Sequence, residues 1–199
     1  MTRLPELPEP CGTVVMVAIL SGLRIGEILA LRWKRVDLLR GTFEVAETFS
    51  DGRFWLTKKT RSSQRILPMS TVLSKVLAAH RSKSVFTENE VMVFATPKGT
   101  PLSSKNLCNR VLAPACDRIK EPRVSWHSFR HAHAALLADS GESIKTVQAL
   151  LGHSDIETTL NTYAHAIPAS QRRAVEQVTR VLFSNVLDLG EKPPDGKMN

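Results

Sequence analysis

The stretch Ser21–Trp33, with the sequence SGLRIGEILALRW, decides how the rest of the chain is interpreted. Apolar residues recur at helical spacing in its second half, which predicts a helix over Arg24–Leu31. The Ser21-Gly22 break separates this helix from an earlier buried one, which we expect over Thr13–Leu20. The chain therefore begins with two short helices joined by a tight turn.

Arg24 and Glu27 stand three residues apart and share one face of the second predicted helix. Taken alone, such a pair is usually a surface ion pair. Arg24, however, lies in a first helical turn, where spare backbone N–H groups and the helix dipole favour an anion. Anion binding by Arg24 is therefore the functional interpretation of the pair.

The next segment changes from helical to strand periodicity. Three short runs are rich in aromatic or β-branched residues and are bounded by turn residues, namely Thr42–Ala46, Arg53–Thr57 and Arg65–Met69. They predict a small three-stranded antiparallel sheet in the N-terminal third. Four basic residues lie on or beside it, namely Lys58, Lys59, Arg61 and Arg65. A basic hairpin is commonly just solvated or a sequence-independent phosphate contact, and the functional alternative is a turn that delivers a lysine to DNA.

Helical signals dominate beyond Ser70, apart from an extended piece expected at Val91–Ala95. Ser125 is the expected N-cap of a helix that runs through Ala138 and is closed by Gly141, and a further helix is expected between Ser143 and Gly152. We therefore predict an α+β fold that is mainly α.

The C-terminal part carries three further expectations. Ser154 and Glu157 form a capping-box pattern that opens a helix carrying Tyr163. Apolar residues at helical spacing predict an amphipathic final helix over 170–186. The residues after Leu189 are expected to be a disordered tail.

His127 and Arg130 stand three apart at the start of the helix that Ser125 opens. An imidazole and a guanidinium on one face suit the binding of an oxyanion. His131 adds a His-x-x-x-His spacing that would suit a metal ion. However, this string lacks the glutamate of a zinc-protease helix, and the adjacent arginine would repel a cation, so we predict no metal site.

His153 follows the helix stop at Gly152, and Tyr163 lies ten residues later. It is the only tyrosine in the chain. A lone tyrosine is normally a core or interface residue. Its chemical interpretation therefore depends on the other polar groups that surround it.

Composition narrows the class of partner. The chain has 199 residues, and its 27 Lys plus Arg against 19 Asp plus Glu give a formal charge of +8. This excess favours a polyanionic partner, although a basic surface alone defines no site. Three cysteines without Cys-x-x-Cys spacing indicate reduced core side chains and a cytoplasmic location. No apolar run is long enough to predict membrane insertion, and no glycine-rich nucleotide motif predicts a cofactor.

Together these motifs resemble the catalytic domain of the tyrosine recombinase, or phage integrase, family. The resemblance extends from about Val14 to Val186 and is specific, because five motifs occur in the family's order. It implies that the catalytic residues are Arg24, Lys59, His127, Arg130, His153 and Tyr163. It also implies that Glu27 orients the first arginine and that Lys58, Arg61 and Arg65 bind the substrate. Lys59 is preferred as the catalytic lysine because a threonine follows it, and Lys58 is the alternative.

The family resemblance further implies a DNA-integrating enzyme of a mobile element, which cleaves and rejoins double-stranded DNA through a 3′-phosphotyrosine at Tyr163. Four protomers would act in pairs and associate through the C-terminal helix, although that helix could instead cover its own core. No metal is required if two arginines stabilise the phosphoryl charge.

We expect residues 1–189 to form this catalytic domain and 190–199 to be the tail. About a dozen residues precede the first predicted helix, so the family's upstream core-binding domain is expected to be absent. Two other functions stay open at this point. One is supercoil relaxation of the type IB topoisomerase kind, and the other is non-catalytic DNA binding.

Overall fold

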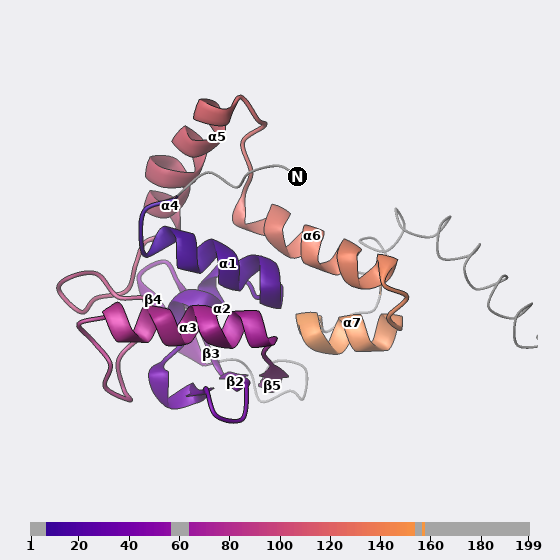
Figure 1. Cartoon of the computed structure of the whole chain (residues 1–199), viewed down its shortest axis with the longest axis horizontal. Coiled ribbons are helices and arrows are strands. Elements are labelled where there is room, and N and C mark those ends of the chain that lie inside the picture. Colours follow the sequence, from indigo (N-terminus) through magenta and orange to yellow (C-terminus); the bar gives the residue numbers. More distant parts are fainter. Residues whose placement is uncertain (1–6, 57–63, 154–156, 158–199) are drawn as a thin grey trace, which may run out of the picture.

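The computed structural model describes residues 7–56, 64–153 and 157. These residues form an α+β fold that is mainly helical, as the sequence predicts (Figure 1). The helices are α1 (Cys11–Ser21), α2 (Ile25–Ala30), α3 (Thr71–Lys83), α4 (Ser104–Leu107), α5 (Ala113–Ile119), α6 (Trp126–Asp139) and α7 (Ile144–Leu151). Two single turns join them, the 3-10 turn η1 (Trp33–Arg35) and the π-helical turn η2 (Cys108–Leu112).

Helix α1 lies at the centre of the core. Its sequence is apolar on nearly every side, and Val14, Val17 and Ala18 are almost fully buried. A helix of this kind belongs in a protein interior. Helices α3 and α6 both pack against it (Figure 1). Phe43 and Leu67 from the strands join the same apolar cluster.

The strands form two small antiparallel sheets, and the predicted single sheet is wrong in this respect. The first sheet has the order β1 (Val36–Asp37), β2 (Thr42–Val45) and β5 (Arg65–Pro68). The second is a hairpin of β3 (Glu47–Ser50) and β4 (Arg53–Leu56). The predicted strand at Arg53–Thr57 is thus β4, whose partner is β3, and β1 is the third strand of the larger sheet.

Strand pairing explains this division. Val45 pairs with Arg65, whereas Glu47, only two residues further along, pairs with Leu56. Ala46 alone therefore separates the strand that belongs to the first sheet from the strand that belongs to the hairpin. The predicted lysine-bearing segment, 57–63, lies outside the described residues.

Helix boundaries agree closely with the capping signals. Ser125 is the N-cap of α6 and its Oγ accepts a hydrogen bond from the backbone N–H of Ser128. Ser143 caps α7 in the same way, and Gly152 ends α7 with a φ of 66°. Such left-handed conformations favour glycine because a Cβ would crowd the backbone.

Helix α2 lies unusually close to β3 because residue 26 is glycine. A Cβ on Gly26 would lie 2.4 Å from Thr48 Oγ1 and 2.9 Å from the carbonyl oxygen of Phe49. No side chain larger than hydrogen fits there without moving the hairpin. This contact fixes the position of Arg24, at the start of α2, relative to the β3–β4 hairpin.

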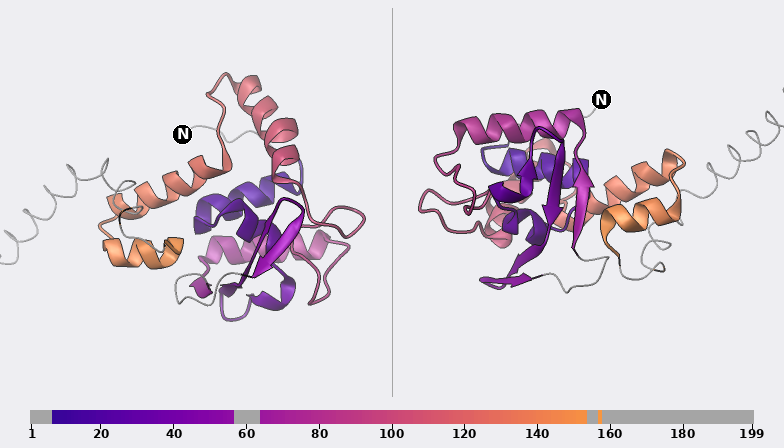
Figure 2. Two further views of the ribbon diagram at one scale, coloured as in Figure 1. Left: turned by 180° about the vertical axis from the view of Figure 1, so that it is seen from behind. Right: turned by 90° about the horizontal axis from the view of Figure 1, so that it is seen from below.

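Helices α6 and α7 lie side by side at one end of the molecule, with α7 running back along α6 (Figures 1 and 2). Ala134, Val147 and Leu151 form a small apolar cluster between them. The C-terminus of α7 thereby returns to the middle of α6. In the part of the chain that the structure describes, no helix combines the length and hydropathy needed to cross a membrane.

Four expectations fall outside the described residues. They are the cap at Ser154, the helix expected to carry Tyr163, the final helix over 170–186 and the tail over 190–199. The cysteines agree in part with the sequence interpretation: all three are free, and Cys11 and Cys116 are buried, but Cys108 is only half-buried.

Candidate active site

Arg24 stands at the N-cap position of α2 with half of its side chain exposed. Its backbone N–H donates to Glu27 Oε2 at 2.9 Å, and its Nη1 donates to Glu27 Oε1 at 3.2 Å. The side chain is 48% exposed, so the other guanidinium donors are accessible. Glu27 therefore orients Arg24 from the buried side, while the rest of the guanidinium is exposed to solvent.

Glu27 is buried and ionised. Burial alone would raise the pKa of its carboxyl, but the charge and hydrogen bonds of Arg65, together with those of Arg24, lower the pKa instead. Arg65 holds the carboxylate with two parallel bonds, from Nη1 to Oε1 at 3.2 Å and from Nη2 to Oε2 at 3.1 Å. This fork geometry is the strong form of an arginine–carboxylate pair.

Arg65 differs from the substrate contact expected of it. Its side chain is only 7% exposed. Besides the two bonds to Glu27, its Nε donates to the carbonyl of Leu150 and its Nη2 to that of Leu151, both at 3.2 Å. Because its guanidinium is directed into the protein, Arg65 is not placed to touch a ligand on the surface.

Arg130 is held in position by main-chain carbonyls. Its Nη1 donates to Gly22 at 2.7 Å and its Nη2 to Leu151 at 2.6 Å. The residue is 4% exposed. Burial and the charge of Arg24 lower the pKa of its guanidinium to about 10, so it remains a cation at neutral pH. Arg130 thus joins the turn before α2 to the end of α7.

His127 lies one turn before Arg130, on the exposed part of α6. Its ring meets that of His131 edge to face, with 4.4 Å between the ring centroids. Partial burial, and the nearby His131, Arg130 and Arg24, lower the pKa of the His127 imidazole. The ring is therefore neutral at neutral pH and able to accept a proton.

His153 is buried directly after the end of α7. Its backbone N–H donates to the carbonyl of Gln148 at 3.2 Å. Burial, followed by the charges of Arg130 and Arg24, lowers the pKa of its imidazole from 6.5 to about 4. Arg65 and His127 act on the same ring in the same direction. His153 is therefore an uncharged group inside a cationic site.

The structure thus brings six of the predicted residues into one electrostatic neighbourhood, namely Arg24, Glu27, Arg65, His127, Arg130 and His153. The other four predicted residues, Lys58, Lys59, Arg61 and Tyr163, lie outside the described residues. The guanidinium groups of Arg24, Arg65 and Arg130 lie near a single carboxylate, that of Glu27, so the site carries excess positive charge. Arg24 is the arginine through which this charge is accessible to solvent. Such a site is suited to a phosphate group.

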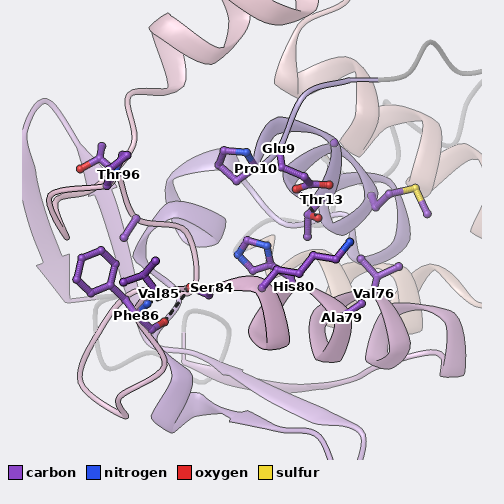
Figure 3. A pocket seen from close by; sticks show the side chains of 15 residues that line it. Glu9, Pro10, Thr13, Val76, Ala79, His80, Ser84, Val85, Phe86 and Thr96 are labelled. Atoms are coloured by element: carbon purple, nitrogen blue, oxygen red, sulfur yellow. Dashed lines mark hydrogen bonds between the residues drawn. The ribbon is translucent and has the colours of Figure 1, made fainter.

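A separate apolar groove lies away from this neighbourhood. Its volume is about 510 Å³, and it opens between the start of α1, the second half of α3 and the segment around Thr96 (Figure 3). No residue of the arginine site lines it. Within residues 7–56, 64–153 and 157, no three His, Cys, Asp or Glu side chains gather to hold a metal ion.

Comparison with known proteins assigns the family. The model of the phage integrase family matches residues 6–169. The chain belongs to the phage integrase family. This match covers α1 to α7 and therefore includes the whole arginine site.

Several curated members of this family are similar in sequence. The ICEBs1 integrase of Bacillus subtilis (strain 168) is 33% identical over 181 residues, which cover 85% of this chain and 49% of that protein. A XerC-like tyrosine recombinase of Caldanaerobacter subterraneus subsp. tengcongensis is 31% identical and covers 81% of this chain and 47% of its own length. The chain thus spans about half the length of the curated relatives it matches.

Solved structures show the same fold. The Tn1549 transposon integrase, in complex with circular intermediate DNA, matches with a TM-score of 0.68 at 23% identity, over 83% of this chain and 59% of that one. The XerA recombinase matches with a TM-score of 0.60 at 18% identity, over 89% of this chain and 65% of its own. The observed fold is therefore that of tyrosine recombinase catalytic domains.

Proposed function

We propose that this chain is the catalytic domain of a site-specific DNA recombinase, which cleaves and rejoins DNA through a 3′-phosphotyrosine at Tyr163. The observation that carries the proposal is the convergence of Arg24, Arg130, His127 and His153 on one cationic site in a member of the phage integrase family. Relatives named integrase and tyrosine recombinase support it, as does a related integrase solved with DNA.

In this proposal Arg24 and Arg130 stabilise the phosphate that is cleaved, Arg24 by direct contact and Arg130 by its charge. Attack on a phosphodiester places negative charge on the phosphoryl oxygens, and donors fixed in advance stabilise that charge most effectively. Arg24 supplies accessible donors, and Glu27 fixes their direction. Arg130 is charged and rigidly held, so it supplies a fixed positive potential at the same place.

The two histidines have different roles. His127 is neutral and partly exposed, so it can accept the phenol proton of Tyr163 as the oxygen attacks phosphorus. His153 is buried and neutral, and we assign it a hydrogen bond to a phosphoryl oxygen. Its depressed pKa matters here, because an added proton would be repelled by the surrounding arginines until a phosphate is bound.

The reaction balances without an external energy source. The Tyr163 oxygen forms a bond to phosphorus, the bond from phosphorus to the 5′ oxygen breaks, and Lys59 gives that oxygen a proton. A 5′ hydroxyl from another strand then attacks the phosphotyrosine, releases Tyr163 and restores a phosphodiester. The lysine and the tyrosine enter this scheme through the sequence motifs, with Lys58 as the alternative donor.

Double-stranded DNA is the proposed partner, and residues 1–189 are the proposed catalytic domain. Binding by this chain is expected to be weak and salt-sensitive, because affinity for DNA depends on the number of phosphates neutralised. Self-association on DNA through residues 170–186 is part of the same proposal. Sedimentation with and without a duplex tests it, since a tetramer should appear only when DNA is present.

Covalent trapping tests the chemistry. The chain is incubated at low salt with a library of nicked duplexes whose central sequence is randomised, so that the nick releases a short fragment and prevents religation. We expect a protein–DNA adduct that survives SDS, and sequencing the attached DNA gives the preferred site. Tyr163→Phe should give no adduct. Adduct formation by this variant would rule out Tyr163 as the nucleophile.

A further inference from the structure

We propose that Arg65 is a positioning residue of the arginine site, which sets the directions of Arg24 and His153 without touching DNA itself. For its effect on catalysis this inference rests on the proposed recombinase function. Its structural part concerns the chain alone and can be tested without DNA.

Arg65 connects three segments that are far apart in the sequence. It begins β5, and its partners are Glu27 in α2, 38 residues away, and the last carbonyls of α7, 85 and 86 residues away. Four hydrogen bonds to these partners occupy Nε, Nη1 and Nη2. The guanidinium is planar and rigid, so two bonds to Glu27 and two bonds to the end of α7 hold these two helices at a fixed separation.

Each of the other two arginines shares an acceptor with Arg65. Glu27 accepts from both Arg24 and Arg65, and the carbonyl of Leu151 accepts from both Arg65 and Arg130. If the Arg65 guanidinium moves, Glu27 and the carbonyl of Leu151 lose one of their donors. Each of these groups also holds one of the other arginines, so Arg24 and Arg130 are both affected.

The missing side chain of Gly152 provides the space for Arg65. A Cβ at this position would lie 2.5 Å from Arg65 Nη1 and 2.6 Å from its Cζ. The guanidinium thus packs directly on the backbone of Gly152, and the next residue is His153. Because His153 follows without an intervening residue, the backbone that orients its ring rests against Arg65.

The first test compares Arg65→Met and Arg65→Lys. Removing the guanidinium should lower the rate of adduct formation at saturating DNA by about 100-fold, the size expected when catalytic groups shift by about an ångström. The apparent affinity for DNA should change little, because Arg65 does not face the surface. Arg65→Lys keeps the charge and should recover part of the rate. An equal loss of affinity in both variants would instead identify a DNA contact and overturn the proposal.

The second test uses a matched pair of glycine substitutions. Gly152→Ala and Gly141→Ala both place a Cβ at a helix end with positive φ, 66° and 84° respectively. Only the first meets Arg65, since nothing lies within 4 Å of a Cβ on Gly141. Both should lose similar stability from backbone strain, but only Gly152→Ala should reproduce the rate loss of Arg65→Met. Equal rates for the two alanine variants would contradict the proposal.

A third measurement separates this inference from the proposed function. The imidazole of His153 is titrated by NMR in the chain without DNA, where its pKa is expected to be about 4. In Arg65→Met the loss of one positive charge by itself raises this pKa, so the readout for positioning is altered chemical shifts of the Arg24 side chain and the His153 backbone. If the wild type forms no adduct but these shifts occur, the recombinase proposal fails and the positioning role stands. If the shifts are absent, the positioning role fails whatever the activity.

Variants that do not fold leave the test intact. Should Arg65→Met fail to fold, Arg65→Lys and the glycine pair still report on the same contact, because they keep a positive charge at position 65. Arg35→Met is the matched arginine control. It also removes a guanidinium paired with glutamates, but its partners are Glu44 and Glu47, so the titration of His153 should not change.

Discussion

Two charge networks, one at α2 and the other built partly on β2 and β3, differ in their balance. The arginine cluster consists of Arg24, Arg65 and Arg130 around Glu27. The hairpin network joins three cations to three carboxylates, namely Arg32, Lys34 and Arg35 with Glu44, Glu47 and Glu90. In the described residues, the first network is left with excess positive charge and the second is neutral.

The two networks differ in net charge because different groups accept the hydrogen bonds of their cations. In the arginine cluster, main-chain carbonyls of Gly22, Leu150 and Leu151 accept them, and these groups carry no full charge. The guanidinium groups are therefore held in place without being neutralised. In the hairpin network, carboxylates both hold and neutralise the cations. A cluster with net positive charge whose cations are held by uncharged acceptors thus indicates an anion site better than the number of basic residues does.

The largest expected effect comes from exchanging one arginine in each network for lysine. Arg130→Lys keeps the charge but cannot reach both carbonyl partners, so the turn before α2 and the end of α7 lose their link. Adduct formation should fall by on the order of 1000-fold, as when preorganised stabilisation of the transition state is lost. Arg32→Lys, in the hairpin network, should change the rate only a few-fold. The nicked-duplex assay measures both. Equal losses would remove the distinction between the two networks.

The next effect concerns stability. Glu27→Gln leaves the buried Arg65 guanidinium and the half-exposed Arg24 without their counter-charge, and should lower the free energy of unfolding by about 3–5 kcal/mol. Glu47→Gln, whose side chain and arginine partners are 16–22% exposed, should cost less, because solvent can reach the unpaired charges. Urea unfolding at pH 7 measures both. A loss for Glu47→Gln as large as that for Glu27→Gln would contradict the assignment of different roles.

The smallest effect is a pH dependence that separates the networks. The pKa of His153 is about 4 in the folded chain against 6.5 for the free group, so the unfolded state binds the proton first as pH falls. Stability should therefore decrease between pH 6.5 and pH 4, by about 3 kcal/mol at most. His153→Asn should lack this loss.

The hairpin network titrates in a lower range. The pKa of Glu44 is lowered, by its hydrogen bond with Gln64 and by Arg35, so its contribution is present above pH 4.5 and is lost as pH falls further. A pH scan of urea midpoints should resolve the two ranges. If His153→Asn and the wild type lose stability in parallel above pH 4.5, the lowered pKa of His153 is not the cause.

Local signals predicted the helices because their ends depend on single residues. Ser125, Ser143 and Gly152 act through hydrogen bonds and backbone angles within one turn, and each helix begins or ends where they indicate. The sheet was predicted less well. Which strand pairs with which depends on where the chain leaves and re-enters the ladder, and that is a tertiary property.

The role of Arg65 shows the same limit, although a signal was present. In the strand Arg65–Pro68, Arg65 and Leu67 are buried while Ile66 is 71% exposed. Alternate residues of a strand face the same side, so Arg65 shares the face of a core leucine. Its place in a basic segment favoured a phosphate contact instead. Only the positions of Glu27 and Leu151, distant in sequence, show what its guanidinium binds.

The close approach at Gly26 bears on how members of this family can be compared. A relative could carry every polar residue predicted for the site and yet have alanine or a larger residue at position 26, which would push the hairpin from α2. We therefore expect a sequence comparison limited to polar residues to overlook a change that displaces Arg24.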